Sequence, residues 1–287
     1  MQTRTFFDPR TSTLTYVVWD ADSRDGVVID PVLDFDPASG RVWTESADAV
    51  ADFVTAEGLT LHFALETHAH ADHLSGSQVF ADRFGARVAI SSAIRTVQEV
   101  FAPVFDKGGG FPTDGSQFDL LVEHGQILEA GTLRIEAIHT PGHTPACVTW
   151  HIEDAVFTGD ALFMPDFGTG RCDFPAGSAE DLYDSVTERL YTLPDATRVF
   201  VGHDYQPGGR ALAWETTIGA SKAQNKQLTA ETDRSQFVQW RTERDATLNP
   251  PRLLLPSIQV NIDAGRLPAA NANGTRYLQL PLKTAGS

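Results

Sequence analysis

The feature that most constrains this 287-residue chain is a run of three histidines and one aspartate within six residues: His68, His70, Asp72 and His73. Side chains two apart in an extended segment point the same way, so His68 and His70 can converge on one point. The chain then turns into a predicted helix, which brings Asp72 and His73 back toward that point. Packing four titratable groups together without a metal would be costly. Imidazole and carboxylate groups suit zinc, iron or manganese, and the run therefore predicts a metal site.

Three more candidate ligands follow strand-like segments later in the chain. They are His143, Asp160 and His203, and each comes directly after a glycine. Glycine allows the backbone to turn sharply at the end of a strand, which brings the next side chain to the rim of a sheet. Ligands of layered α/β proteins commonly gather on such a rim. We therefore expect these three residues to join the first run at the metal site.

Strand-like and helix-like segments alternate along the chain, with several adjacent strand-like runs toward both ends. Residues 14–19 and 26–31 predict an antiparallel hairpin across a polar turn. Helices are predicted over residues 46–58, 72–84, 179–191 and 211–233. The alternation indicates a single domain over residues 1–287, in which helices cover two β-sheets. Its C-terminal part, from about 208 to 287, is expected to hold a helix and a proline-rich tail that packs on the surface.

Composition excludes several classes of protein. Acidic residues outnumber basic ones, 38 to 22, and the net charge is −16. This argues against a nucleic-acid partner, because phosphate binding needs a basic face, and against a polybasic membrane anchor. The sequence has no apolar stretch of about 18 residues and no apolar run near its N-terminus, so neither a membrane span nor a secretory signal is expected. Two cysteines, Cys147 and Cys172, are too few for a disulfide scaffold, and we expect a cytoplasmic protein.

The metal-site motifs resemble those of the metallo-β-lactamase fold superfamily, because seven positions match that family's ligands in the same order. These positions are His68, His70, Asp72, His73, His143, Asp160 and His203. The resemblance implies an α/β fold, an αββα sandwich of two mixed β-sheets flanked by helices, with the metal at one edge. An aspartate at position 160 is similar to the glyoxalase-type branch rather than to true β-lactamases. A histidine at position 70 argues against flavodiiron proteins, which carry glutamate there.

Within the superfamily, the chain is most similar to persulfide dioxygenases of the ethylmalonic-encephalopathy-protein type. The matching segments lie between residues 12 and 205, and include residues 170–174 and the run 203–205. The resemblance implies a dioxygenase that uses O₂ to oxidise glutathione persulfide to sulfite and glutathione. It also implies one Fe(II) per chain, held by His68, His143 and Asp160.

By the same resemblance, the remaining ligand-type residues would lie beside the iron, where they would orient its ligands and handle protons. They are His70, Asp72, His73 and His203, of which Asp72, His73 and His203 are expected to be catalytic. A substrate with carboxylates needs local cations in an acidic protein, and arginine suits bidentate contacts with carboxylates. The expected substrate-binding residues are Arg171, Tyr205, Arg210 and Arg252.

A binuclear thioester hydrolase of the glyoxalase II type is the main alternative, because all seven donors are present. One zinc or iron would take His68, His70 and His143, the other Asp72, His73 and His203, and Asp160 would bridge them. The two metals would generate a hydroxide that attacks the thioester carbonyl. The run 170–174 and the short, proline-rich C-terminal part favour the dioxygenase. A third alternative, a degenerate scaffold that serves as a partner module, is disfavoured by the intact ligand set. The sequence leaves the exact persulfide, the metal and a homodimer open.

Overall fold

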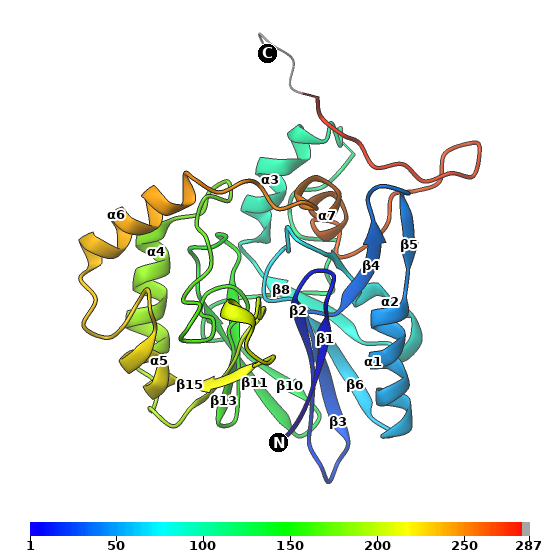
Figure 1. Cartoon of the computed structure of the whole chain (residues 1–287). Coiled ribbons are helices and arrows are strands. Elements are labelled where there is room, and N and C mark those ends of the chain that lie inside the picture. Colours follow the sequence, from blue (N-terminus) through cyan, green and yellow to red (C-terminus); the bar gives the residue numbers. More distant parts are fainter. Residues whose placement is uncertain (109, 283–287) are drawn as a thin grey trace.

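Two six-stranded β-sheets form the centre of the computed structural model, which describes residues 1–108 and 110–282 (Figure 1). The first sheet is antiparallel through its first three strands and parallel through the rest. Its order is β1 (Gln2–Asp8), β2 (Thr13–Trp19), β3 (Asp25–Ile29), β6 (Thr60–Leu65), β8 (Arg87–Ser91) and β9 (Leu120–Val122). The predicted hairpin is confirmed as β2 and β3, in which Tyr16 pairs with Ile29.

The second sheet is antiparallel except where β13 meets β14, so that β11, β13 and β14 run in the same direction. Its order is β10 (Ile127–Ala130), β11 (Leu133–His139), β12 (Val148–Ile152), β13 (Ala155–Phe157), β14 (Arg198–Phe200) and β15 (Glu215–Thr217). A small third sheet joins β5 (Arg41–Trp43), β4 (Val32–Asp36) and β7 (Leu74–Ser75).

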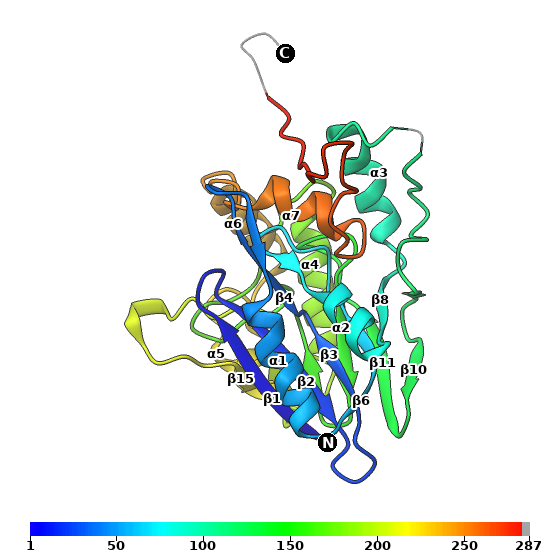
Figure 2. The ribbon, with the colours of Figure 1, turned by 90° about the vertical axis from the view of Figure 1, so that its right-hand side faces the viewer.

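Helices lie on the outer face of each large sheet, which gives the expected αββα sandwich (Figures 1 and 2). Neighbouring side chains of a strand point to opposite faces. In β2, Tyr16 contacts Phe157 and Phe200 of the second sheet, while Val17 joins the core beneath the helices. The first sheet is covered by α1 (Glu45–Ala56), α2 (Ser77–Phe84) and α3 (Ile94–Val104). On the side of the second sheet lie α4 (Ala179–Asp184) with the π-helical turn Ser185–Leu190, α5 (Ile218–Gln224) and α6 (Arg234–Asp245).

Helix α2 begins at Ser77, and the prediction that it starts at residue 72 is wrong. Leu74 and Ser75 pair instead with β4 as the short strand β7. Asp72 and His73 therefore lie in a loop and not in the first turn of a helix. The end of α2 is as predicted, because Gly85 adopts the left-handed conformation (φ 70°) that terminates many helices.

The predicted helix over residues 211–233 is wrong over most of its length. Residues 215–217 pair with β14 as the edge strand β15, and the helix that follows ends at Gln224. The Oδ1 atom of Asn225 accepts hydrogen bonds from the N–H groups of Gln227 and Leu228, each at 3.0 Å. This side chain competes with the helical backbone for partners and closes a turn.

The region from 208 to 287 contains α5, α6 and a further helix, α7 (Leu254–Asn261), within the residues that the structure describes. Ile258, Val260 and Ile262 are fully buried, so α7 belongs to the core although a surface location was expected. Residues 266–282 run along the surface (Figure 2). Residues 283–287 of the predicted tail lie outside the described residues, and so does residue 109. None of the described helices is long and apolar enough to cross a membrane.

Candidate metal centre

The candidate ligands come from loops that follow strands of both large sheets. The run 68–73 follows β6, His143 follows β11, Asp160 follows β13 and His203 follows β14. Because β11, β13 and β14 run in the same direction, their carboxyl ends meet at one edge of the second sheet. The rim expected from the sequence therefore exists, and it faces the end of β6.

The glycine that precedes Asp160 is needed for two reasons. Gly159 has φ 49°, in the left-handed region that disfavours other residues. A Cβ atom at this position would also lie 2.4 Å from Oγ1 of Thr67, which is the residue just before the histidine run. The two loops thus approach each other more closely than any side chain at position 159 would allow.

The side chains of His68, His143 and Asp160 form the first donor group. They offer ligand atoms that all lie within 4.8 Å of one another. Nε2 of His143 is 3.4 Å from Oδ2 of Asp160, and Nδ1 of His143 donates a hydrogen bond to the carbonyl of Arg171 at 2.6 Å. This bond leaves Nε2 without its proton in the neutral imidazole and directs it to the centre of the group.

His68 is oriented by a short chain of hydrogen bonds. The hydroxyl of Thr67 donates to Oδ2 of Asp30 at 2.7 Å, so its oxygen accepts the Nδ1–H of His68 at 3.0 Å. Nε2 of His68 is then the unprotonated nitrogen. Burial, together with the neighbouring imidazoles of His70 and His143, holds the pKa of His68 well below its usual range. The ring is therefore in the neutral form that binds metals.

A second donor group lies beside the first and shares Asp160. Nε2 of His203 is 3.3 Å from Oδ2 of Asp72 and 3.4 Å from Oδ1 of Asp160. Nδ1 of His73 is 3.6 Å from Oδ2 of Asp72. Burial opposes ionisation of Asp72, but His203 and His73 lower the pKa of its carboxyl well below the usual range. The two oxygens of Asp160 thus face different groups, one toward His143 and the other toward His203.

His70 is held from behind by two carboxylates. Its Nε2 atom is 3.1 Å from Oδ1 of Asp30 and 3.3 Å from Oε2 of Glu66. Glu66 in turn accepts hydrogen bonds from the hydroxyls of Ser75 and Ser77. Burial lowers the pKa of His70, but the two carboxylates outweigh it and raise that pKa well above the usual range. The sequence patterns did not mark Asp30 and Glu66 as site residues, although each directly follows a buried strand that leads toward the rim.

Unpartnered polar atoms show that these residues fit a metal. Buried polar atoms in folded proteins nearly always have a hydrogen-bond partner. Within the described part of the chain, six buried atoms of the seven candidate ligands form no hydrogen bond: Nε2 of His68, Nδ1 and Nε2 of His70, Nε2 of His73, Oδ2 of Asp72 and Oδ1 of Asp160. Imidazole nitrogens and carboxylate oxygens are the ligand atoms that zinc and iron take. A bound metal would satisfy atoms that the protein itself leaves without a partner.

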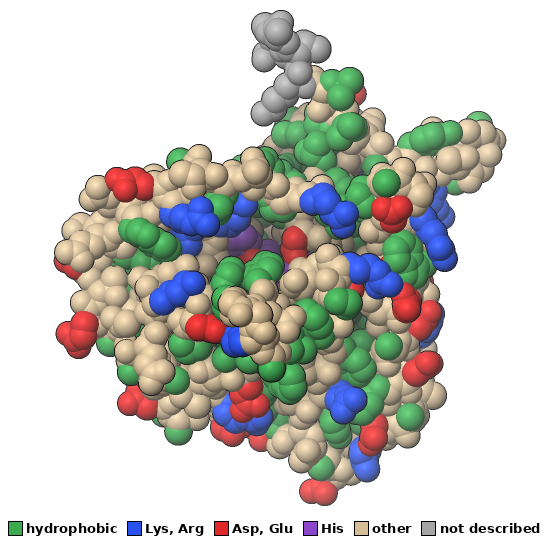
Figure 3. All heavy atoms as spheres, viewed as in Figure 1, with side chains coloured by type: hydrophobic (Ala, Val, Ile, Leu, Met, Phe, Trp, Pro, Cys, Tyr) green, Lys and Arg blue, Asp and Glu red, His purple; other side chains and the backbone are tan. Residues whose placement is uncertain are grey.

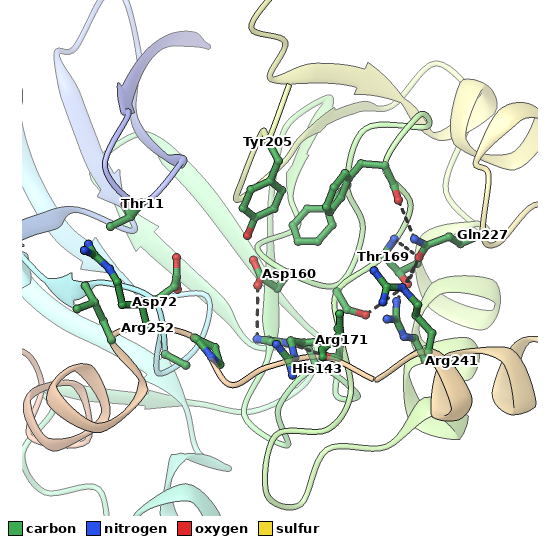
Figure 4. Close-up of a pocket in the computed structure, with 18 of the residues that line it drawn as sticks. Thr11, Asp72, His143, Asp160, Thr169, Arg171, Tyr205, Gln227, Arg241 and Arg252 are labelled. Atoms are coloured by element: carbon green, nitrogen blue, oxygen red, sulfur yellow. Dashed lines mark hydrogen bonds and ion pairs between the residues drawn. The ribbon is translucent and has the colours of Figure 1, made fainter. Parts of the chain in front are cut away.

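A cavity of about 560 Å³ opens beside the metal-site residues (Figure 4). Asp72, His143 and Asp160 are among the residues that line it. Much of the remaining lining is aromatic or basic: Phe163, Phe167, Tyr205, Trp240, Arg10, Arg171, Lys226, Arg241, Arg244 and Arg252. Figure 3 shows basic side chains around a central hollow in which histidine and acidic atoms are visible. The rim of this cavity is thus largely basic, although the net charge of the whole protein is −16.

The structure brings three of the four predicted substrate residues to the cavity: Arg171, Tyr205 and Arg252. Arg210 does not line it, because its guanidinium group is paired with Asp166 and Asp204. Arg210 thus braces the segment that follows His203. The sequence patterns did not predict the basic residues of the rim at positions 10, 226, 241 and 244, because these residues come from segments far apart in the chain.

Comparisons with known proteins agree with this geometry. The sequence pattern of the Metallo-beta-lactamase superfamily matches residues 8–203. The chain belongs to this superfamily. A probable metallo-hydrolase of Burkholderia pseudomallei is 47% identical over 96% of the chain and 97% of its own length. Glyoxylase B2 of Dictyostelium discoideum is 42% identical over 96% of the chain and 95% of its own length. The chain spans only 64% of a beta-lactamase hydrolase-like protein of Agrobacterium fabrum, at 46% identity over 97% of the chain.

Persulfide dioxygenases are also among the relatives of this superfamily member. The mitochondrial persulfide dioxygenase ETHE1 of Bos taurus is 37% identical over 70% of the chain and 68% of its own length. The crystal structure of ETHE1 from Myxococcus xanthus has a TM-score of 0.74 and 33% identity, and the match covers 93% of this chain and 100% of that one. The chain is thus a member of a superfamily of enzymes, and it has a candidate metal centre of His and Asp donors.

Proposed function

We propose that this protein is a persulfide dioxygenase, which oxidises glutathione persulfide with O₂ to sulfite and glutathione at a single Fe(II). The observation that carries the proposal is the group of two histidines and one carboxylate, His68, His143 and Asp160, of which His143 and Asp160 line a cavity with a basic rim. Iron held by such a triad supplies O₂ chemistry and keeps coordination positions open for ligands other than the protein. The similarity to ETHE1 proteins supports this reading.

The chain's own residues would bind and orient the persulfide. Arg252 has no ion pair among the described residues and lines the cavity, so its guanidinium group is available to a substrate carboxylate. Arg171 also lines the cavity, but its guanidinium already binds Asp173 and the carbonyl of Asn249. Its more direct role is to orient His143 through its own backbone carbonyl.

Proton handling would fall to the residues beside the triad. Tyr205 is 46% exposed as a whole, but its hydroxyl lies among protein atoms beside two carboxylates. Desolvation by these atoms, and then the charges of Asp160 and Asp72, raise the pKa of the hydroxyl well above its usual range. Tyr205 therefore stays protonated, and in Figure 4 its hydroxyl points toward Asp160. His203 is placed between Asp72 and Asp160, and burial opposes the charge on its ring while these two carboxylates raise its pKa. Asp72, His73 and His203 are the groups that we propose to exchange protons with bound substrate.

A binuclear thioester hydrolase is the second candidate function, and one observation favours it. The second donor group lies directly beside the first and shares Asp160, so the seven donors could hold two metals. The 42% identity to Glyoxylase B2 agrees with this reading. A metal pair would supply a bridging hydroxide for attack on a thioester carbonyl.

Oxygen uptake distinguishes the two functions. Protein loaded with Fe(II) under anaerobic conditions is given glutathione persulfide and O₂, and sulfite is measured in the same vessel. Uptake matched by sulfite is expected. No uptake, together with hydrolysis of S-lactoylglutathione by protein loaded with two metals per chain, would assign the hydrolase.

A further inference from the structure

The C-terminal helix α7 reaches the metal-binding run from behind and ends there with a buried amide. Asn261, the last residue of α7, is only 4% exposed. Its Nδ2 atom donates hydrogen bonds to the carbonyls of His70 at 2.7 Å and His73 at 2.8 Å. Its Oδ1 atom accepts a hydrogen bond from the N–H group of Ser75 at 2.8 Å. One side chain therefore uses both of its N–H donors and its carbonyl on the same loop.

This loop has little structure of its own. Residues 68–73 belong to no helix or strand, so their backbone groups find no partners in a regular ladder. The two carbonyls that Asn261 binds lie on either side of Asp72, and the segment between them carries three of the seven metal donors. Fixing both carbonyls and the N–H group of Ser75 fixes the path of the backbone through all three donors.

Helix α7 is itself held firmly. Ile258 and Val260 are fully buried, and the carbonyl of Ile262, just beyond the helix, accepts a hydrogen bond from Gln98 of α3 at 2.8 Å. Gln78 of α2 donates to the carbonyl of Ala264 at 2.7 Å. The amide of Asn261 is therefore placed by the core of the molecule, which gives the loop a rigid support.

We propose that Asn261 is a positioning residue of the metal centre, which acts through the backbone of residues 70–75. Ligand groups must be held to within about 0.5 Å of the productive geometry, and loops reach that precision only when their surroundings support them. The superfamily pattern ends at residue 203, so this support comes from a segment outside it. The inference rests on the metal site of the proposed function and is independent of the reaction.

Metal binding by variants at position 261 tests the proposal. Asn261→Asp has nearly the same shape and keeps the acceptor for Ser75, but it puts an oxygen opposite the two carbonyls. Asn261→Ala removes all three bonds. The matched control is Gln259→Ala on the same helix, because the Gln259 amide binds Leu255 and Gln279 and not the loop. Each protein is titrated with Fe(II) and with Co(II) against a competing chelator, and the visible spectrum of bound Co(II) reports the ligand geometry.

We expect both variants at position 261 to bind either metal about 10- to 100-fold more weakly, the range seen for residues that orient metal ligands. Their Co(II) spectra should shift, while Gln259→Ala stays within about twofold of the parent protein and keeps its spectrum. Folded variants at position 261 with the parent affinity and spectrum would overturn the proposal. If neither variant folds, the milder Asn261→Ser takes their place, and parent-like metal binding in that protein would overturn the proposal equally. Absence of dioxygenase turnover in the parent protein would count against the proposed reaction alone, because these titrations measure binding.

Discussion

At the scale of single residues, hydrogen bonds decide which nitrogen of each histidine faces the centre. The carbonyl of Arg171 takes the Nδ1–H of His143, and the hydroxyl of Thr67 takes that of His68. Sequence spacing predicted the seven donors but not these hydrogen-bond partners. The partner of His143 is a backbone carbonyl, which every residue has, and the orientation of the Thr67 hydroxyl is known only from the folded chain. Asp30 and Glu66 were missed for a related reason: only the folded chain shows which carboxylates at strand ends turn toward His70.

His143→Ala should abolish tight iron binding, because only one histidine and one carboxylate of the triad remain. We expect at least about 100-fold weaker Fe(II) binding and no turnover, measured by chelator competition and metal analysis. His139→Ala is the control, since His139 lies just before the same turn and contacts Val122 and Ser91 rather than the metal centre. A His143→Ala protein with full iron content would show that the ligand assignment is wrong.

Arg252→Ala should raise KM for glutathione persulfide by about tenfold with little change in kcat. The magnitude is that of one lost hydrogen bond between charged groups. Steady-state kinetics measure the effect. Arg276→Ala is the control, because Arg276 does not line the cavity that contains Arg252 and the metal-site residues. An unchanged KM would remove Arg252 from the substrate site.

At the scale of elements, strand ends and turns were predictable where a local pattern specifies them. The hairpin β2–β3, helix α1 and the glycine before each late ligand all follow from short-range signals. Helix α7 was not predictable in this way. Its polar residues Ser257, Gln259 and Asn261 alternate with apolar ones, and it contains Pro256, so the sequence shows no helical periodicity there. Burial against β7 and α3 decides its structure.

Gly159→Ala should lower both the stability of the protein and its affinity for Fe(II). The left-handed conformation costs an alanine about 1 kcal/mol, and the new Cβ would also push Thr67 away from His68. Gly40→Ala is the matched control, because Gly40 has a similar φ of 67° and open space around its Cβ position. We expect Gly40→Ala to lower thermal stability slightly and Gly159→Ala to lower both stability and Fe(II) affinity, the latter by tenfold or more. Equal metal affinity in the two variants would contradict the close contact between the loops.

At the scale of the whole molecule, the acidic surface and the basic cavity rim determine how kcat/KM for an anionic substrate changes with salt concentration. Salt screens charges beyond about 10 Å at 0.1 M, so a substrate anion near the rim responds mainly to the local arginines. We expect kcat/KM for glutathione persulfide to fall about threefold between low salt and 0.3 M salt. In Arg252→Ala the fall should be smaller. A rise with salt would show that the net charge of −16 dominates the encounter.

The rim is also the part of the site that could not be predicted from the sequence. The aromatic and basic residues of its wall come from loops and helices between positions 10 and 252, and only the packing of both sheets with α6 and the segment that leads to α7 brings them together. The expectation of a single domain over residues 1–287 stays a prediction.

We propose that one iron binds at His68, His143 and Asp160, and that Asp72, His73 and His203 hold no second metal. Anomalous diffraction from crystals loaded with Fe(II) without oxygen, recorded on both sides of the iron and zinc absorption edges, tests this directly. We predict one iron peak between the first three side chains and no peak in the second group. Two peaks on either side of Asp160 would contradict the account and assign the binuclear hydrolase.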